Sequence, residues 1–257
     1  MPPEFSVAEE FRSYPLPAED DRFEALVASV RFEDVGIGRR GAVLVRPDEP
    51  RGVPIVRTTT RFAAPAQVFG PIHEQLSLLI QAAASLPTGF NNALVETYTP
   101  AYATMGGHSD LALDLADGSV VAVFSCYQHP PAGRPPRSLL VGAKGARGRE
   151  AEVPLAHNTA VVFSLDTNRR FRHRIVLDPA CRGGEDRWLG VTFRVSKSFV
   201  RYGGGVARFE DAVSLTPATE DQRREFYGWR TRENSETDFA YPRVTYTLSE
   251  SDLRPPG

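Results

Sequence analysis

The segment Met105-Gly106-Gly107-His108-Ser109-Asp110-Leu111 decides how the rest of the chain is interpreted. It follows the strand-like run Ala93-Leu94-Val95-Glu96-Thr97-Tyr98 and places an imidazole and a carboxylate two residues apart. In an extended backbone, the side chains at positions i and i+2 point to the same face. The pattern therefore predicts that His108 and Asp110 can bind one metal ion from the same side.

A second histidine on a facing strand would complete a set of two histidines and one carboxylate. Such a set leaves positions open for small ligands and typically holds Fe(II). The best candidate is His173, in the run Arg170-Phe171-Arg172-His173-Arg174-Ile175-Val176. An isolated His-x-Asp occurs by chance in many chains, so its weight depends on the motifs around it. The alternative for His173 is a partly exposed strand residue among arginines.

The run Arg187-Trp188-Leu189-Gly190-Val191-Thr192-Phe193-Arg194 indicates a buried strand with an arginine near each end. A buried arginine is costly unless it meets an anion. The planar guanidinium group suits a carboxylate in particular. Arg187 and Arg194 are therefore candidates to bind a ligand that carries a carboxylate.

Taken together, these motifs resemble the AlkB-like branch of the iron and 2-oxoglutarate dependent oxygenases. Their order and spacing agree with that branch over residues 54–199. The motifs that carry the resemblance are Phe90-Asn91-Asn92-Ala93-Leu94-Val95-Glu96-Thr97-Tyr98, His108-Ser109-Asp110, Gly118-Ser119-Val120-Val121-Ala122-Val123-Phe124-Ser125, Phe171-Arg172-His173 and Thr192-Phe193-Arg194.

The resemblance implies that His108, Asp110 and His173 are the ligands of Fe(II), and that 2-oxoglutarate and O2 are the cosubstrates. Halogenating relatives in the superfamily lack the carboxylate ligand, so the presence of Asp110 implies oxygen insertion. The resemblance also assigns Arg194 to the far carboxylate of 2-oxoglutarate. Tyr98 matches a tyrosine that helps to hold the same cosubstrate, and its phenol can donate to a carboxylate.

Two positions depart from the pattern of the branch. Arginines six residues apart are common there, whereas Arg187 and Arg194 are seven apart, and a shift of one residue in a strand reverses the face. Trp188 is therefore expected to share a face with Arg194, which leaves the role of Arg187 in doubt. Glu96 stands where the branch usually has asparagine. Since Glu96 and Tyr98 share a face, we hypothesise that Glu96 meets an arginine or a cationic group of the substrate.

Bulk composition is that of an ordinary globular protein, with 41% hydrophobic and 24% charged residues in a chain of 257. The net charge of −2 gives no general attraction to nucleic acid or to an anionic membrane. The sequence shows no signal peptide and no apolar run of transmembrane length. We therefore expect a cytoplasmic protein in which Cys126 and Cys181 are reduced thiols.

Apolar residues recur at helical spacing in residues 23–30 and 72–86, and a capping-box pattern at 219–222 predicts a third helix. His73 lies one place off the apolar stripe of its helix, so we expect it at the surface. Many short apolar runs bounded by Gly, Pro or Asn follow. The pattern predicts a mainly β protein with flanking helices (α+β) and a double-stranded β-helix (jelly-roll) core.

We expect one domain overall, with three parts. Residues 1–60 supply a helix and strands that cover the active site, and they begin with a loosely held arm at residues 1–17. Residues 61–199 form the oxygenase core, and residues 200–257 are an extension packed on that core. Arg57 and Arg61 lie near the expected mouth of the site and are candidate contacts to the substrate, as is Glu96. A solvated strand face is the simpler explanation for the two arginines.

Four functions are compatible with these observations. The favoured one is a dioxygenase that hydroxylates a small molecule, such as an amino acid or a biosynthetic intermediate. The alternatives are an AlkB-type oxidative demethylase of nucleic acid, a protein side-chain hydroxylase and a non-catalytic binding module. The acidic balance and the absence of a basic stripe with interleaved aromatics count against nucleic acid. The sequence leaves the oligomeric state open.

Overall fold

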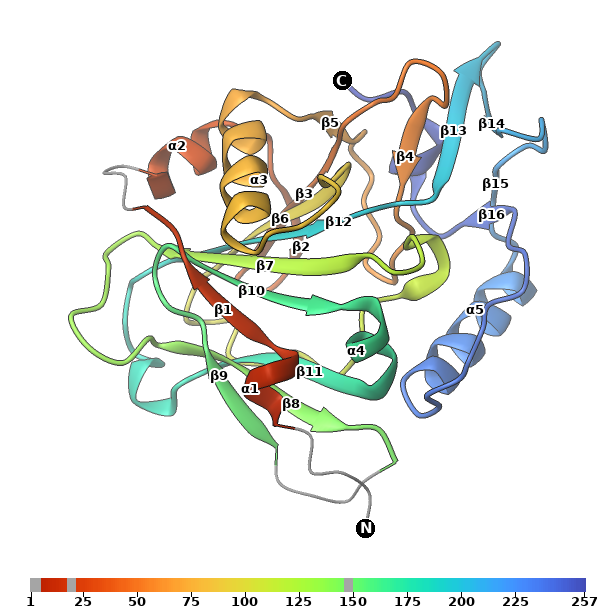
Figure 1. Cartoon of the computed structure of the whole chain (residues 1–257). Coiled ribbons are helices and arrows are strands. Elements are labelled where there is room, and N and C mark those ends of the chain that lie inside the picture. The colour runs from red at the N-terminus through yellow and green to blue at the C-terminus, as the bar shows by residue number, and fades with distance from the viewer. Residues whose placement is uncertain (1–5, 18–21, 146–149) are drawn as a thin grey trace.

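The larger of two central sheets is built from the short apolar runs that the sequence separates by turns (Figure 1). The computed structural model describes residues 6–17, 22–145 and 150–257. All pairings in this sheet are antiparallel except that of β5 with β3. Its strands, in spatial order, are β1 (Arg12–Pro15), β10 (Thr159–Ser164), β7 (Val120–Tyr127), β12 (Trp188–Arg194), β6 (Asn92–Tyr98), β3 (Arg39–Val45) and β2 (Glu33–Gly36), with β5 (Gln67–Val68) beside β3.

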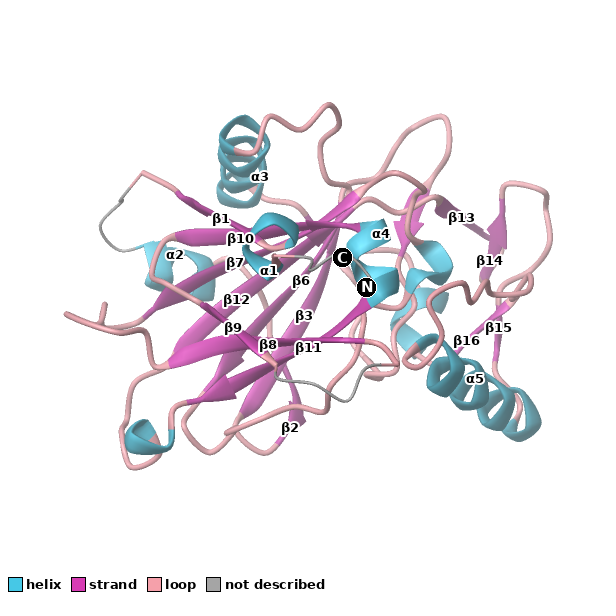
Figure 2. Ribbon diagram, turned by 60° about the horizontal axis from the view of Figure 1, so that its bottom comes forward, coloured by secondary structure: helices cyan, strands magenta, loops and turns pink. Residues whose placement is uncertain are grey.

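The smaller sheet consists of β11 (Phe171–Leu177), β8 (Arg137–Ala143) and β9 (Ala151–Pro154). The segment 103–108 extends it beyond β11 through antiparallel bridges that pair residues 104 with 176 and 108 with 173. The spatial order is therefore 103–108, β11, β8, β9. Figure 2 shows β8, β9 and β11 lying across the strands of the larger sheet.

From β6 to β12 the chain alternates between the two sheets. It visits the larger sheet at β6, β7, β10 and β12, and the smaller sheet at 103–108, β8–β9 and β11. This path is a double-stranded β-helix, so the predicted fold class is confirmed. Side chains of both sheets meet in one apolar cluster, which includes Val121, Val123, Val161 and Phe163 from the larger sheet and Leu139, Val141, Phe171 and Ile175 from the smaller one.

Two helices cover the other face of the larger sheet, as Figure 1 shows: α2 (Arg22–Ala28) and α3 (Pro71–Ala83). Their apolar stripes pack on outward-facing strand residues such as Val95 and Phe193. The expectation that His73 lies at the surface is wrong, because this residue is 1% exposed. Its Nδ1 accepts a hydrogen bond from the Gly70 N–H at 2.9 Å. His73 thus caps the start of α3, a role that the apolar stripe does not reveal.

The N-terminal segment is held more firmly than the sequence suggested. After α1 (Val7–Glu10), β1 pairs with β10 along the edge of the larger sheet. Phe11 is 2% exposed and its ring lies 4.7 Å from that of Phe163. The expectation of a loosely held arm is therefore wrong for residues 6–17, and residues 1–5 lie outside the described part of the chain.

Residues beyond β12 pack against the core rather than apart from it. Leu111, which follows Asp110, shares an apolar cluster with Phe226 of the extension. Within the described residues, no helix has the length and apolar character needed to span a membrane. The remaining elements are β4 (Val53–Ile55), β13 (Ser198–Gly203) and β14 (Val206–Phe209) in one sheet, the parallel pair β15 (Thr216–Pro217) and β16 (Tyr246–Thr247), the helices α4 (Leu165–Arg170) and α5 (Glu220–Glu233), and the short 3-10 helices η1 (Ala112–Asp114), η2 (Pro179–Cys181) and η3 (Glu250–Leu253).

Candidate metal centre

His108 and His173 form a cross-strand pair between the segment 103–108 and β11. The His108 N–H donates to the His173 carbonyl at 2.9 Å, and the His173 N–H donates back at 2.6 Å. Residues directly opposite each other in such a ladder present their side chains on the same face. The two imidazole centroids are accordingly 4.8 Å apart.

Asp110 completes a group of three possible metal ligands. Its Oδ1 lies 3.7 Å from Nε2 of His173. One ligand atom of each residue, His108, Asp110 and His173, can be chosen so that all three lie within 4.8 Å of one another. Because metal–ligand bonds to nitrogen and oxygen are about 2 Å long, small side-chain rotations suffice for all three to bind one ion.

The hydrogen bonds of the imidazoles suit metal binding. Nδ1 of His108 donates to the Gly106 carbonyl at 2.9 Å, which leaves its Nε2 unprotonated and available as a ligand. Burial, followed by the neighbouring His173, lowers the pKa of His108 to about 3, so the ring is neutral. Nδ1 of His173 is buried and has no hydrogen-bond partner among the described residues.

Arg194 keeps Asp110 ionised. Burial by itself would raise the pKa of Asp110, but Arg194 and His173 reverse this effect and hold the pKa well below its usual value. Nε of Arg194 donates to Asp110 Oδ2 at 2.8 Å, while Oδ1 faces His173. The set therefore offers one carboxylate and at least one neutral imidazole, which is a suitable donor set for a divalent transition metal.

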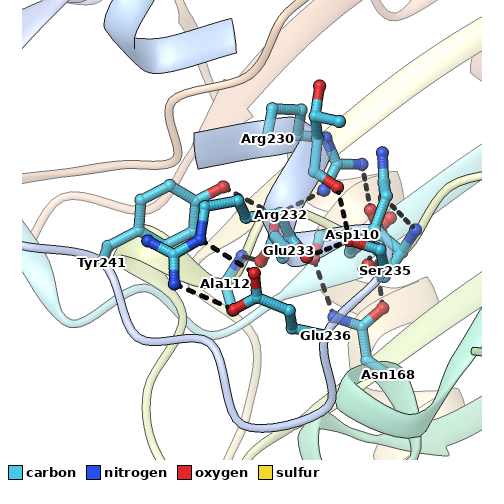
Figure 3. A network of polar contacts seen from close by, with 12 residues as sticks. Asp110, Ala112, Asn168, Arg230, Arg232, Glu233, Ser235, Glu236 and Tyr241 are labelled. Atoms are coloured by element: carbon cyan, nitrogen blue, oxygen red, sulfur yellow. Dashed lines mark hydrogen bonds and ion pairs between the residues drawn. The ribbon is translucent and has the colours of Figure 1, made fainter. Parts of the chain in front are cut away.

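The backbone of Asp110 is fixed by a side chain from α4. The Asp110 N–H donates to Oδ1 of Asn168 at 2.7 Å, and Nδ2 of Asn168 donates to the Asp110 carbonyl at 2.7 Å. Asn168 is 1% exposed, so these bonds are sheltered from water. Figure 3 shows this contact within the polar network around the metal-binding segment.

The C-terminal end of α5 holds the same segment from another side (Figure 3). Asn234 accepts a hydrogen bond from the Ser109 N–H at 3.1 Å, and Arg230 donates to the Ser109 carbonyl. Glu233 accepts from the Ala112 N–H at 2.8 Å. We call Arg230, Glu233 and Asn234 the α5 clamp. The sequence indicated a helix here but carried no signal for its contact with the metal-binding segment.

Glu233 is itself held in place by two further residues. The Tyr241 hydroxyl donates to Glu233 Oε2 at 2.7 Å, and the same oxygen forms an ion pair with Arg230. Nζ of Lys144 donates to the Glu233 carbonyl at 2.6 Å. The α5 clamp is thus anchored both to the extension and to the loop that follows β8.

Glu96 and Tyr98 face the interior as expected, and each has a partner. The Tyr98 hydroxyl donates to Glu96 Oε2 at 2.8 Å, and Nε of Arg39 donates to Glu96 Oε1 at 2.7 Å. Arg39 is therefore the arginine that our hypothesis for Glu96 required. Burial and the nearby Glu96 raise the pKa of Tyr98 well above its usual value, so its phenol stays a donor.

The structure places Arg194, the last residue of β12, and Arg187, the residue before β12, on opposite faces of the larger sheet. Arg194 binds the candidate ligand Asp110. Arg187 points to the helix-covered face, where its guanidinium carbon lies 5.4 Å from the centre of the Phe23 ring. Nε of Arg187 donates to Gln128 at 2.9 Å. The structure does not bring Arg187 to the metal set, because the seven-residue spacing puts it on the opposite face. Trp188 faces the interior instead, with Nε1 donating to Ser125 Oγ at 2.7 Å.

Arg57 and Arg61 are not part of the metal set either. Arg57 is 3% exposed and forms a double hydrogen-bonded ion pair with Asp114, at 3.0 and 2.6 Å. It also donates to the carbonyls of Val244 and Tyr246, at 2.7 and 3.1 Å. This guanidinium therefore connects the core to the extension, while Arg61 is exposed.

A cavity of about 890 Å³ lies between the core and the extension. Its lining includes Arg57, Phe209 and Tyr241, but none of the three candidate metal ligands. The cavity is therefore separate from the metal set.

Comparisons with known proteins give similarities to solved structures at low sequence identity. No protein-family model matches the chain, and no curated protein matches its sequence. Among solved structures, the chain is similar to "OsALKBH1", with 14% identity, a TM-score of 0.45 and coverage of 69% of this chain and 92% of that one. It is also similar to a Pseudomonas putida prolyl-4-hydroxylase, with 18% identity, a TM-score of 0.41 and coverage of 73% and 95%.

Proposed function

We propose that this protein is an Fe(II)- and 2-oxoglutarate-dependent dioxygenase, an oxidoreductase that hydroxylates a small molecule. One observation carries the proposal: His108, Asp110 and His173 converge inside a double-stranded β-helix with their ligand atoms within 4.8 Å of one another. Three protein ligands on one face leave open positions for an oxo acid and dioxygen. The donor chemistry of this ligand set, rather than any one relative, supports the assignment.

In this proposal, His108, Asp110 and His173 would hold the metal ion, which supplies the oxidising chemistry when O2 and the oxo acid are bound. Arg194 keeps Asp110 charged and binds its Oδ2, which leaves Oδ1 available to hold a metal ion. The apolar residues beside the set limit the access of water. Phe163, for example, is 2% exposed and its ring centre lies 5.3 Å from that of His173.

The proposed substrate is a small molecule rather than nucleic acid or a membrane component. The chain has 30 basic and 32 acidic residues, and an excess of positive charge is the usual requirement for binding phosphate backbones. An amino acid or a biosynthetic intermediate fits this charge balance.

Succinate formation tests the proposal. The protein, loaded anaerobically with Fe(II), would be mixed with 2-oxoglutarate and O2 in the presence of a panel of amino acids and modified nucleosides. We expect substrate-stimulated succinate formation that is lost in Asp110→Ala. Release of formaldehyde from methylated single-stranded DNA would favour the demethylase instead. Failure of the intact protein to bind Fe(II) would refute the proposed function.

A further inference from the structure

The cavity between the core and the extension has no role in the proposed chemistry. Its volume of about 890 Å³ lies within the range of small-molecule sites, which is about 300–1,000 Å³. One part of its wall comes from η1, which follows the metal-binding segment directly, and another part comes from the loop 237–244 of the extension. A ligand in the cavity would therefore contact two segments that are far apart in the chain.

Aromatic rings form much of the wall of the cavity. Four aromatic side chains line it: Phe199, Phe209, Phe239 and Tyr241. The rings of Phe239 and Tyr241 meet edge to face, with their centres 4.9 Å apart and an interplanar angle of 84°. Leu113 of η1 and Tyr241 both pack against the apolar cluster that contains Phe226, which gives this part of the wall a firm support. The aromatic body of a ligand would be sheltered from water between these side chains.

The charged groups that line the cavity leave one carboxylate without a partner. All four cationic groups of the lining are paired: Arg57 with Asp114, Arg169 and Lys197 with Asp117, and Arg243 with Asp211. Two more of the five carboxylates are paired with arginines outside the lining: Asp166 with Arg170 and Glu210 with Arg51.

The fifth carboxylate is that of Asp238, which has no hydrogen bond or ion pair within the part of the chain that the structure describes. Arg232 acts on Asp238 without direct contact, because its guanidinium group binds Glu236 at 2.8 and 3.0 Å. A cationic ligand therefore finds an opposite charge that is available, whereas an anionic ligand finds none. Charge complementarity of this kind mainly determines which ligand is selected.

Two residues of the cavity wall meet at the carboxylate of Glu233 in the α5 clamp (Figure 3). The Tyr241 hydroxyl donates to Glu233 Oε2 at 2.7 Å, and the Ala112 N–H donates to Glu233 Oε1 at 2.8 Å. Tyr241 and Ala112 both line the cavity, and Ala112 is two residues after the candidate ligand Asp110. A continuous hydrogen-bonded path therefore leads from the cavity to the metal-binding segment.

We propose that the cavity is a second ligand site, which binds a small organic cation with an aromatic body and couples its occupancy to the metal-binding segment through Tyr241 and Glu233. The coupling, but not the site itself, rests on the metal binding of the proposed function. The aromatic wall receives the body of the ligand, and Asp238 receives its cationic group. A ligand that packs against the Tyr241 ring holds the hydroxyl toward Glu233. Because coupling between two sites is reciprocal, a bound metal ion tightens the binding of the cation by the same factor.

Calorimetric titration of the full chain tests the cation site. Tryptamine and indole-3-propionate carry the same indole ring on chains of similar length, but at neutral pH one is a cation and the other an anion. We expect tryptamine to bind at least about 10-fold more tightly, because only the cation meets an available charge. Asp238→Asn should raise the Kd for tryptamine about fivefold, the upper value for an exposed ion pair.

Asp34→Asn is the matched control for this titration. The Asp34 carboxylate is also exposed but lies outside the lining of the cavity, so its replacement should leave both Kd values unchanged. Absence of tryptamine binding, or equal Kd values for the two probes, would overturn the cation site.

The Kd for Mn(II), measured with and without saturating tryptamine, tests the coupling. We expect tryptamine to lower this Kd about fivefold, the lower end of typical coupling between sites. Tyr241→Phe keeps the ring in the cavity but removes the donor to Glu233, so tryptamine should still bind while the Kd for Mn(II) no longer responds. Tyr202→Phe is the control and should keep the response, because the Tyr202 hydroxyl donates to the Asp252 carbonyl, away from the α5 clamp.

The outcomes separate this inference from the proposed function. A full response in Tyr241→Phe, or no response in the unaltered protein, would overturn the coupling. Where thermal unfolding shows that Tyr241→Phe does not fold, Glu233→Gln replaces it, because an amide in place of the carboxylate removes one of the two acceptors. If the unaltered protein binds no Mn(II) or Fe(II), the proposed function fails, whereas the titration with tryptamine still decides the cation site.

Discussion

Replacing Asn168 with alanine would reveal how far the metal set depends on the peptide groups around Asp110. The amide of Asn168 accepts from the Asp110 N–H and donates to the Asp110 carbonyl, both at 2.7 Å. Without it, one buried donor and one buried acceptor lose their partners, and each such loss costs about 1–3 kcal/mol. We therefore expect Asn168→Ala to lower the free energy of unfolding by about 2–6 kcal/mol, measured by urea denaturation of the metal-free protein.

The same change should weaken metal binding, because residues that orient a ligand typically contribute about 10- to 100-fold to metal affinity. Asn91 provides a matched control. Its amide accepts from the Ser196 N–H at 2.7 Å and donates to the Ser196 carbonyl at 3.0 Å, with no contact to the metal set. Asn91→Ala should also destabilise the fold but leave the Kd for Fe(II) or Mn(II) unchanged. Equal metal affinities for the two variants would refute the reasoning.

Three further predictions concern other buried charges. Arg57→Ala should lower the free energy of unfolding by about 3–5 kcal/mol, because it leaves Asp114 buried without its partner. The exposed Arg61 is the control, and Arg61→Ala should change the free energy of unfolding by less than about 0.5 kcal/mol. Similar losses for the two variants in urea denaturation would contradict this prediction. Burial raises the pKa of Asp252 from 3.8 to about 6, so the folded protein binds a proton more tightly than the unfolded chain, and stability falls as the pH rises through 6. Asp252→Asn should remove this dependence, which amounts to about 3 kcal/mol between pH 4 and pH 6, and an unchanged pH profile of unfolding would count against it. Glu233→Ala should raise the Kd for Fe(II) or Mn(II) about 10-fold, and an unaltered Kd would show that the α5 clamp does not act on the candidate metal ligands.

The three candidate metal ligands could be predicted from the sequence because the prediction rests on short local patterns. The i, i+2 spacing of His108 and Asp110 needs only an extended backbone, and His173 lies in a run with strand character. Parity along a strand likewise placed Trp188, rather than Arg187, on the face of Arg194. The many short apolar runs indicated a jelly-roll of two sheets, and the resemblance to the AlkB-like oxygenases implied the double-stranded β-helix core.

Contacts between segments that are far apart in the sequence could not be predicted from such local patterns. The sequence indicated that Glu96 needs a partner but could not name Arg39, which lies on a neighbouring strand far earlier in the chain. The prediction that His73 lies at the surface was wrong because its position depends on a hydrogen bond from the Gly70 N–H, which hydropathy does not reveal. Arg137, at the start of β8, would be expected in water from its charge, yet it is 2% exposed. Its guanidinium carbon lies 5.2 Å from the centre of the Tyr98 ring and 6.0 Å from that of Trp188, contacts that the sequence does not reveal.

The α5 clamp also has a consequence for how the protein is made. All three candidate ligands have been synthesised once His173 has left the ribosome, yet Arg230, Glu233 and Asn234 emerge only some tens of residues later. Until then the Ser109 and Ala112 peptide groups lack their helical partners. A nascent chain therefore has all three candidate ligands before the α5 clamp can hold the segment between them, and under the proposed function we expect tight metal binding only after α5 has formed.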